Sequence, residues 1–113
     1  MGVLSRNDNR LILFLLNSCG IITKSLQKNA MKSAQILVVE DEISIQTIVR
    51  TYLESSGYGV TVVDNGPDAL VQARQRQPDL VILDLNLPGM DGMEVAARLR
   101  EASGVYILML SAR

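Results

Sequence analysis

Four short runs of apolar and β-branched residues recur along the second part of the chain and restrict its fold more than any other feature. They lie at 36–39, 60–63, 80–83 and 106–110. Runs of this length and composition are typical of strands that are buried on both faces. The segments between them have helical periodicity, so the predicted order is β-α-β-α-β-α-β. Strands that alternate with helices in this way indicate an α/β fold with a parallel sheet and right-handed crossovers.

Three helices are predicted between these strands. Gly57 and Gly59 end the first, Pro67 begins the second, which runs to about Gln77, and Asp91 is the expected N-cap of the third. Apolar residues at helical spacing define the faces expected to be buried. These residues are Ile45, Ile48, Val49, Tyr52 and Leu53 in the first helix, Ala69, Leu70 and Ala73 in the second, and Met93, Ala96 and Leu99 in the third.

The composition excludes several classes of function. With 113 residues the chain is long enough for one small domain. Its 11 Lys and Arg residues nearly balance its 12 Asp and Glu residues, so it lacks the basic field of a nucleic-acid-binding segment. It contains no His, the commonest metal ligand, so a metal would have to be a hard cation bound by oxygen, such as Mg²⁺ or Ca²⁺.

The first thirty residues differ in character from the rest. An apolar run at 11–16 follows two arginines, but it is too short to span a bilayer. We expect residues 1–30 to be an N-terminal extension that is disordered, or that arises from a mis-assigned start with the true start at Met31. An exported or lipid-anchored form that uses Cys19 is an alternative, because the segment has the outline of an export signal.

Acidic residues follow two of the predicted strands. Glu40 and Asp41 come directly after 36–39, Asp84 comes directly after 80–83, and Ser111 follows 106–110. In open parallel sheets, ligands bind just beyond the carboxyl ends of the strands, so these side chains are expected to converge. Clustered carboxylates repel one another, and Mg²⁺ would relieve that repulsion.

Asp84 is chemically suited to forming an acyl phosphate. An ordinary carboxylate is already ionised at neutral pH and needs no base to act as a nucleophile. A bridging Mg²⁺ would offset the negative charge on the phosphoryl group during transfer. The alternative for Glu40, Asp41 and Glu42 is a helix-dipole role at the start of the following helix. Asp64 is assigned to a turn or cap.

From about residue 34 to residue 113 the chain resembles the receiver domain of bacterial response regulators. The matching text is ILVVEDE at 36–42, LVILDLNLPGMDG at 80–92 and LSAR at 110–113. The resemblance implies a flavodoxin-like (CheY-like) fold with strand order 2-1-3-4-5. It also implies a sensor histidine kinase as phosphoryl donor, a cytoplasmic location without a membrane partner, and no enzyme activity of its own. LSAR is similar to receivers of winged-helix regulators, in which DNA would be bound only through a C-terminal domain.

The resemblance also implies roles for individual residues. Asp84 corresponds to the phosphorylated residue and a Mg²⁺ ligand, Asp41 to a direct Mg²⁺ ligand, and Glu40 to a residue that assists through water. Asn86 corresponds to the position whose backbone carbonyl binds the metal. Ser111 corresponds to the switch residue. Pro88 and Gly89 correspond to the residues that shape the loop beside the acceptor.

The chain departs from the family pattern at its C-terminal end. The fourth helix, the fifth strand with its Lys, and the fifth helix are not represented, and no Lys follows Lys32. We therefore expect an incomplete receiver of marginal stability, in which strand 106–110 is a bare edge that is prone to dimerisation or aggregation.

Three other functions compete with a signalling receiver. The first is a non-functional fragment of a truncated response regulator gene, and the second is the membrane-tethered form. The third is a hydrolase of the haloacid dehalogenase type. That group requires a second Asp two residues after the nucleophile, where this chain has Asn86, which argues against it.

Overall fold

The computed structural model describes residues 3–5 and 33–111, and the side chains of 33–110. The expectations for the N-terminal extension, for Cys19 and for a start at Met31 therefore fall almost entirely outside the described residues. Within the described part of the chain, no helix is long and apolar enough to cross a membrane.

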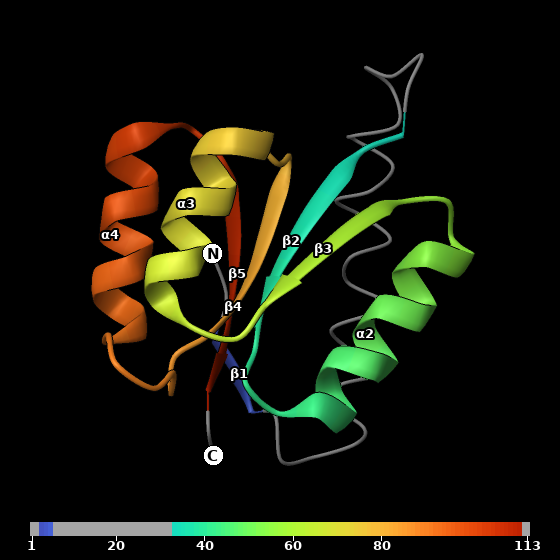
Figure 1. Ribbon diagram of the computed structural model, residues 1–113, viewed down its shortest axis with the longest axis horizontal. Coiled ribbons are helices and arrows are strands. Elements are labelled where there is room, and N and C mark those ends of the chain that lie inside the picture. The colour runs from blue at the N-terminus through green and yellow to red at the C-terminus, as the bar shows by residue number, and fades with distance from the viewer. Residues whose placement is uncertain (1–2, 6–32, 112–113) are drawn as a thin grey trace.

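Five parallel strands form one twisted sheet in the order β1-β5-β4-β2-β3 (Figure 1). Four of them are the predicted strands: β2 (Gln35–Val39), β3 (Gly59–Val63), β4 (Leu80–Asp84) and β5 (Tyr106–Ser111). The order β3-β2-β4-β5 matches the first four positions of the expected flavodoxin-like order. The predicted α/β class and parallel sheet are confirmed.

The fifth strand, β1 (Val3–Ser5), was not predicted. It pairs in parallel with β5, so that Val3 lies opposite Met109 and Ser5 opposite Ser111. The prediction of a bare edge is therefore wrong for the second half of β5, because β1 occupies that edge. β1 also lies where the resemblance places a fifth strand. Sequence patterns missed it because a three-residue strand has too few residues to show a period.

The helices cover both faces of the sheet (Figure 1). α2 (Ile43–Ser55) lies on one face, whereas α3 (Gly66–Arg76) and α4 (Gly92–Ala102) lie on the other. Their ends follow the capping rules: the side chain of Asn65 accepts a hydrogen bond from Asp68 N, and the side chain of Asp91 accepts one from Met93 N. The predicted N-cap at Asp91 is confirmed, while Asn65, and not Asp64, caps α3.

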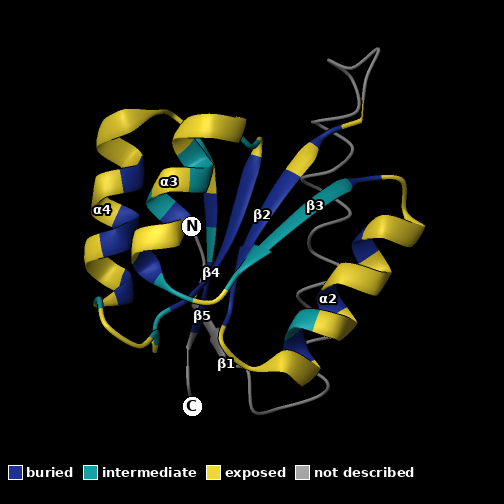
Figure 2. Cartoon of the chain, in the orientation of Figure 1, coloured by how far each residue is buried: buried dark blue, intermediate teal, exposed yellow. Residues whose placement is uncertain are grey.

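The core consists of two layers, one on each face of the sheet. Alternate strand residues point to opposite faces, as the two-residue period requires. All five residues of β4 are buried, which agrees with its place between β5 and β2 (Figure 2). Toward α2 the layer contains Ile36, Val38, Leu80, Ile82, Ile45, Val49 and Leu53, and toward α3 and α4 it contains Leu37, Val39, Val81, Leu83, Ala69, Val95, Ala96 and Leu99.

Three residues assigned to buried faces are exposed. Ile48, Tyr52 and Met93 have exposed fractions of 46%, 43% and 54%. Each helix buries a narrower stripe than the apolar pattern suggested, and in α4 the buried position belongs to Val95 instead of Met93. Apolar residues at a helix flank fit the helical period equally well, so periodicity alone does not separate flank from centre.

Candidate functional site

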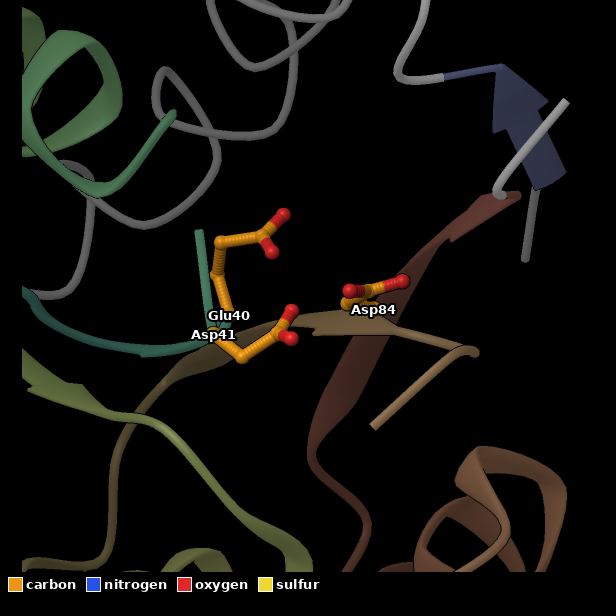
Figure 3. A group of neighbouring side chains, drawn as sticks. All are labelled: Glu40, Asp41 and Asp84. Atoms are coloured by element: carbon orange, nitrogen blue, oxygen red, sulfur yellow. The ribbon is translucent and has the colours of Figure 1, made fainter. Parts of the chain in front are cut away.

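Three carboxyl groups converge at the carboxyl ends of two neighbouring strands. Glu40 and Asp41 directly follow β2, and Asp84 is the last residue of β4. The two strands pair in parallel with Val39 opposite Leu83, which brings Glu40 level with Asp84. Oxygen atoms from the three carboxyl groups lie within 4.8 Å of one another, and Figure 3 shows the three side chains side by side. The expected convergence is present for these three carboxyl groups.

The three groups differ in their exposure to solvent. Glu40 and Asp84 both have exposed fractions of 0%, whereas Asp41 is exposed. Glu40 and Asp84 are the two buried ionisable acids of the described core. Burying carboxylates costs free energy unless a counter-charge or hydrogen bonds compensate. Burying this cluster therefore lowers the stability of the fold. Water and ions can reach it at Asp41, its exposed member.

Backbone contacts fix the position of Glu40. Its N–H donates to Val63 O at 3.0 Å, and its side-chain Oε2 accepts from Glu42 N at 3.0 Å. Gln46, in the first turn of α2, donates its side-chain amide to the carbonyl of Glu40. These contacts hold the turn between β2 and α2, so the carboxyl group of Glu40 is directed into the cluster.

Burial raises the pKa of Glu40 to about 8, the largest cause being the loss of solvent around its carboxyl group. The hydrogen bond from Glu42 N acts in the opposite direction. The nearby charge of Asp84 and hydrogen bonds shared with Asp84 and Asp41 raise the pKa further. In the metal-free protein at neutral pH, Glu40 thus retains a proton, which reduces the repulsion within the cluster.

Asp84 is held by the loop that follows it. Its Oδ1 accepts a hydrogen bond from Asn86 N at 2.9 Å, and Leu85 N donates to Leu110 O at 3.0 Å. The second contact continues the ladder between β4 and β5 past the end of β4. Asp84, the candidate nucleophile, is therefore held by the sheet on one side and by the loop after β4 on the other.

The first residue of α4 approaches the loop more closely than a side chain would allow. A Cβ atom on Gly92 would lie 2.5 Å from Leu85 Cα and 2.9 Å from Asp84 O. Glycine at this position lets the start of α4 pack directly against the backbone of Asp84. Sequence analysis did not identify Gly92 as a site residue, because close backbone approach leaves no signal in a single sequence beyond the glycine itself.

The other predicted site residues lie in the loop after β4 or at the end of β5. Asn86, Pro88 and Gly89 are exposed residues of the loop between β4 and α4, and Gly89 has φ of 85°, in the left-handed region that favours glycine. The backbone of Ser111 ends β5, one residue beyond Leu110, which lies opposite Asp84. The side chain of Ser111 is outside the described part of the chain.

The donor set suits a hard divalent cation. It offers only carboxylate oxygens, arranged around a shared space and accessible from solvent at Asp41. Mg²⁺ binds one or two protein carboxylates together with water and phosphate oxygens, and such an ion would offset the repulsion among these groups. On binding, it would displace the proton of Glu40.

Comparison with known proteins gives a consistent result. A model of the response regulator receiver domain family matches residues 36–113. The alkaline phosphatase synthesis transcriptional regulatory protein PhoP of Bacillus subtilis (strain 168) is 46% identical over 80 residues, which cover 70% of this chain and 33% of that protein. The DNA-binding response regulator MtrA of Mycobacterium tuberculosis (strain H37Rv) is 44% identical over 79 residues, 70% of this chain and 35% of that protein. The chain thus spans about one third of these relatives.

Solved structures resemble a similar share of the chain. The BeF3-activated N-terminal receiver domain of Klebsiella pneumoniae RstA aligns with a TM-score of 0.67 and 34% identity, covering 70% of this chain and 68% of that one. The Vibrio cholerae chemotaxis protein CheY4 aligns with a TM-score of 0.65 and 36% identity, covering 68% of this chain and 67% of that one.

Proposed function

Because the chain belongs to the response regulator receiver domain family, we propose that it receives a phosphoryl group on Asp84 in a Mg²⁺-dependent reaction. The observation that carries this proposal is the buried cluster at the carboxyl ends of β2 and β4, where Asp84 lies beside Glu40 and Asp41. A buried carboxylate with two acidic neighbours is costly for stability alone, and a phosphoacceptor site explains that cost.

The reaction requires little of the protein beyond position and charge. A carboxylate oxygen of Asp84 attacks the phosphorus atom, the bond from phosphorus to the donor breaks, and the leaving group keeps the bonding electron pair. A Mg²⁺ ion held at the acidic cluster would supply positive charge to the phosphoryl oxygens during transfer. Asp41 and Asp84 would hold the ion directly and Glu40 through water, and the hydrogen bond from Asn86 N keeps Asp84 oriented. The carbonyl of Asn86 is proposed as a further ligand.

The remaining roles follow from the family and complete the proposal. A sensor histidine kinase donates the phosphoryl group, the hydroxyl of Ser111 responds to it, and Pro88 with Gly89 shapes the acceptor loop. Two relatives carry names that denote transcriptional or DNA-binding regulators. We extend this to a role in transcription in the cytoplasm, with DNA bound through a separate C-terminal domain.

Labelling with a small acyl phosphate tests the proposal. Incubating the chain with acetyl phosphate and Mg²⁺ should add one phosphoryl group, measured by intact-protein mass spectrometry. Asp84→Asn should abolish the addition. Asp91→Asn is a matched control, since Asp91 caps α4 outside the cluster, and it should be labelled like the parent chain. Equal labelling of the Asp84→Asn variant would refute the assignment.

The competing proposal is a non-functional fragment. Under that alternative the cluster would still bind Mg²⁺, but neither a phosphodonor nor a kinase would label Asp84. The two proposals thus differ in labelling and agree in metal binding.

A further inference from the structure

Gln46 contacts the short turn that carries two of the three acidic side chains. It lies in the first turn of α2, and its side-chain amide donates a hydrogen bond to the carbonyl of Glu40. Its backbone N–H donates to Glu42 O at 3.0 Å, and the residue is half-buried. The backbone and the side chain of Gln46 thus both hold the turn between β2 and α2.

The carbonyl that Gln46 contacts follows the last paired residue of β2. Val39 lies opposite Val63 on β3 and opposite Leu83 on β4, and the N–H of Glu40 still donates to Val63 O. The carbonyl of Glu40 accepts its hydrogen bond from the side chain of Gln46. A backbone carbonyl of a buried residue needs a donor, and the amide of Gln46 supplies one just beyond the strand ladder.

This carbonyl belongs to the peptide unit that joins Glu40 to Asp41. A peptide unit is planar, so a hydrogen bond that fixes the direction of its C=O also fixes its N–H and restricts the Cα atoms at both ends. The side chains of Glu40 and Asp41 leave the backbone at these two Cα atoms (Figure 3). Gln46 therefore restricts the starting position of two of the three carboxyl groups.

The position of these groups matters for a metal such as Mg²⁺. That ion requires near-ideal octahedral geometry with bonds of about 2.0–2.1 Å. Residues that orient a metal ligand without touching the metal contribute to affinity, and their substitution typically costs about 10- to 100-fold. The contact of Gln46 with the Glu40 carbonyl is of this kind, because it orients the backbone from which Glu40 and Asp41 extend.

We propose that Gln46 is a positioning residue of the metal site, which raises Mg²⁺ affinity by fixing the peptide unit between Glu40 and Asp41. This inference rests on the proposed function, in which the same acidic cluster holds Mg²⁺. Gln46 acts through the backbone of its neighbours and not by contact with the ion.

A polar cavity of about 330 Å³ adjoins Gln46 and separates the two effects that its removal would have. The other lining residues come from α2, β3 and the start of α3: Arg50, Val62, Val63, Asp64 and Asp68. Water from this cavity would take the place of the missing amide, which limits the loss of folding stability. A water molecule does not hold the carbonyl in one direction, so metal affinity should fall more than stability.

Gln46→Met tests the proposal, because methionine has a similar length but no hydrogen-bond donor. Gln75→Met is the matched control, since Gln75 is an exposed residue in the last turn of α3, which precedes the start of β4. In calorimetric titration with Mg²⁺, the affinity of Gln46→Met should fall about tenfold or more, while that of Gln75→Met should equal the parent value. Gln46→Asn keeps the amide on a side chain one methylene shorter, and it should lose affinity in the same direction.

Labelling with acetyl phosphate separates positioning from folding. In Gln46→Met, the Mg²⁺ concentration for half-maximal labelling rate should rise about tenfold or more, whereas the rate at saturating Mg²⁺ should fall by a smaller factor. A residue that served folding alone would lower the melting temperature and leave the Mg²⁺ dependence of the folded chains unchanged. That pattern would overturn the proposal.

Calorimetry distinguishes a failure of this inference from a failure of the proposed function. If the parent chain binds Mg²⁺ but Asp84 takes no label, the phosphoacceptor role fails, and weaker binding by Gln46→Met still supports the role of Gln46. Equal Mg²⁺ affinity in the parent, Gln46→Met and Gln46→Asn chains would overturn that role even where Asp84 is labelled normally. A parent chain that binds no Mg²⁺ would overturn both.

Discussion

Glu40 is the residue whose environment differs most from that of an ordinary surface acid. It is fully buried, its turn is fixed by contacts with Glu42 and Gln46, and its pKa is raised to about 8, chiefly by burial. The raised pKa favours the protonated form of Glu40 at neutral pH, which reduces the repulsion within the acidic cluster when no metal is bound. This links the stability of the domain both to pH and to Mg²⁺.

The free energy of unfolding should fall with rising pH in the absence of metal. Glu40 loses its proton near pH 4.5 in the unfolded chain and near pH 8 in the folded protein. Between these two pH values the folded state binds more protons than the unfolded chain. The stabilisation from protonated Glu40 is therefore complete below about pH 4.5 and is lost as the pH rises toward 8. The slope from this group is at most about 1.4 kcal/mol per pH unit.

Urea denaturation in EDTA at several pH values between 5 and 8 measures this effect. Glu40→Gln is the control, because its amide does not titrate, and it should flatten the profile over this range. Saturating Mg²⁺ should raise stability most at the alkaline end, where no proton has to be displaced. A parent profile that rises between pH 5 and 8 in EDTA would contradict the assignment of the pKa.

Asp41 should contribute mainly to metal affinity. It is the exposed member of the cluster, so Asp41→Asn removes a charged ligand without leaving a buried cavity. We expect Mg²⁺ affinity, measured by calorimetric titration, to fall about tenfold or more, with little change in metal-free stability. Asp79→Asn is the control: Asp79 lies at the opposite end of β4, so this substitution should leave Mg²⁺ affinity unchanged. An unaltered affinity in Asp41→Asn would remove this residue from the metal site.

At the scale of elements, the contact between α4 and the acceptor loop depends on Gly92. Gly92→Ala would place a methyl group 2.5 Å from Leu85 Cα, and the backbone must move to accept it. We expect the free energy of unfolding to fall by about 1–3 kcal/mol. Labelling of Asp84 should also be slower, because the displaced backbone includes that of Asp84.

Gly104→Ala is a suitable comparison for Gly92→Ala. Gly104 precedes β5, and a Cβ atom there would meet nothing within 4 Å. Denaturation and acetyl phosphate labelling of the two variants can be compared directly. Similar stability and labelling in both would show that α4 accommodates the methyl group without moving the acceptor loop.

Most elements could be predicted from the sequence because their signals are local. The apolar runs of β2 and β4 and the capping residue Asp91 each carry a pattern within a few residues. The exposure of Ile48 and Tyr52 could not be predicted, because it depends on how α2 is rotated about its axis against the sheet. That rotation is a property of packing between distant elements.

For the whole molecule, the convergence of the site residues follows from the topology. A parallel sheet brings the carboxyl ends of β2 and β4 to one edge, and this was sufficient to place Glu40, Asp41 and Asp84 together. The raised pKa of Glu40 and the docking of β1 could not be predicted, because both arise from contacts between segments distant in sequence.

Mapping the site of phosphoryl attachment tests the central claim most directly. After labelling with acetyl phosphate and Mg²⁺, reduction with borohydride converts a phosphorylated aspartate into homoserine, which tandem mass spectrometry locates in a peptide. The account predicts homoserine at position 84 alone, and none when EDTA replaces Mg²⁺. Homoserine at position 41, or label that resists reduction because it lies on a hydroxyl group, would contradict it.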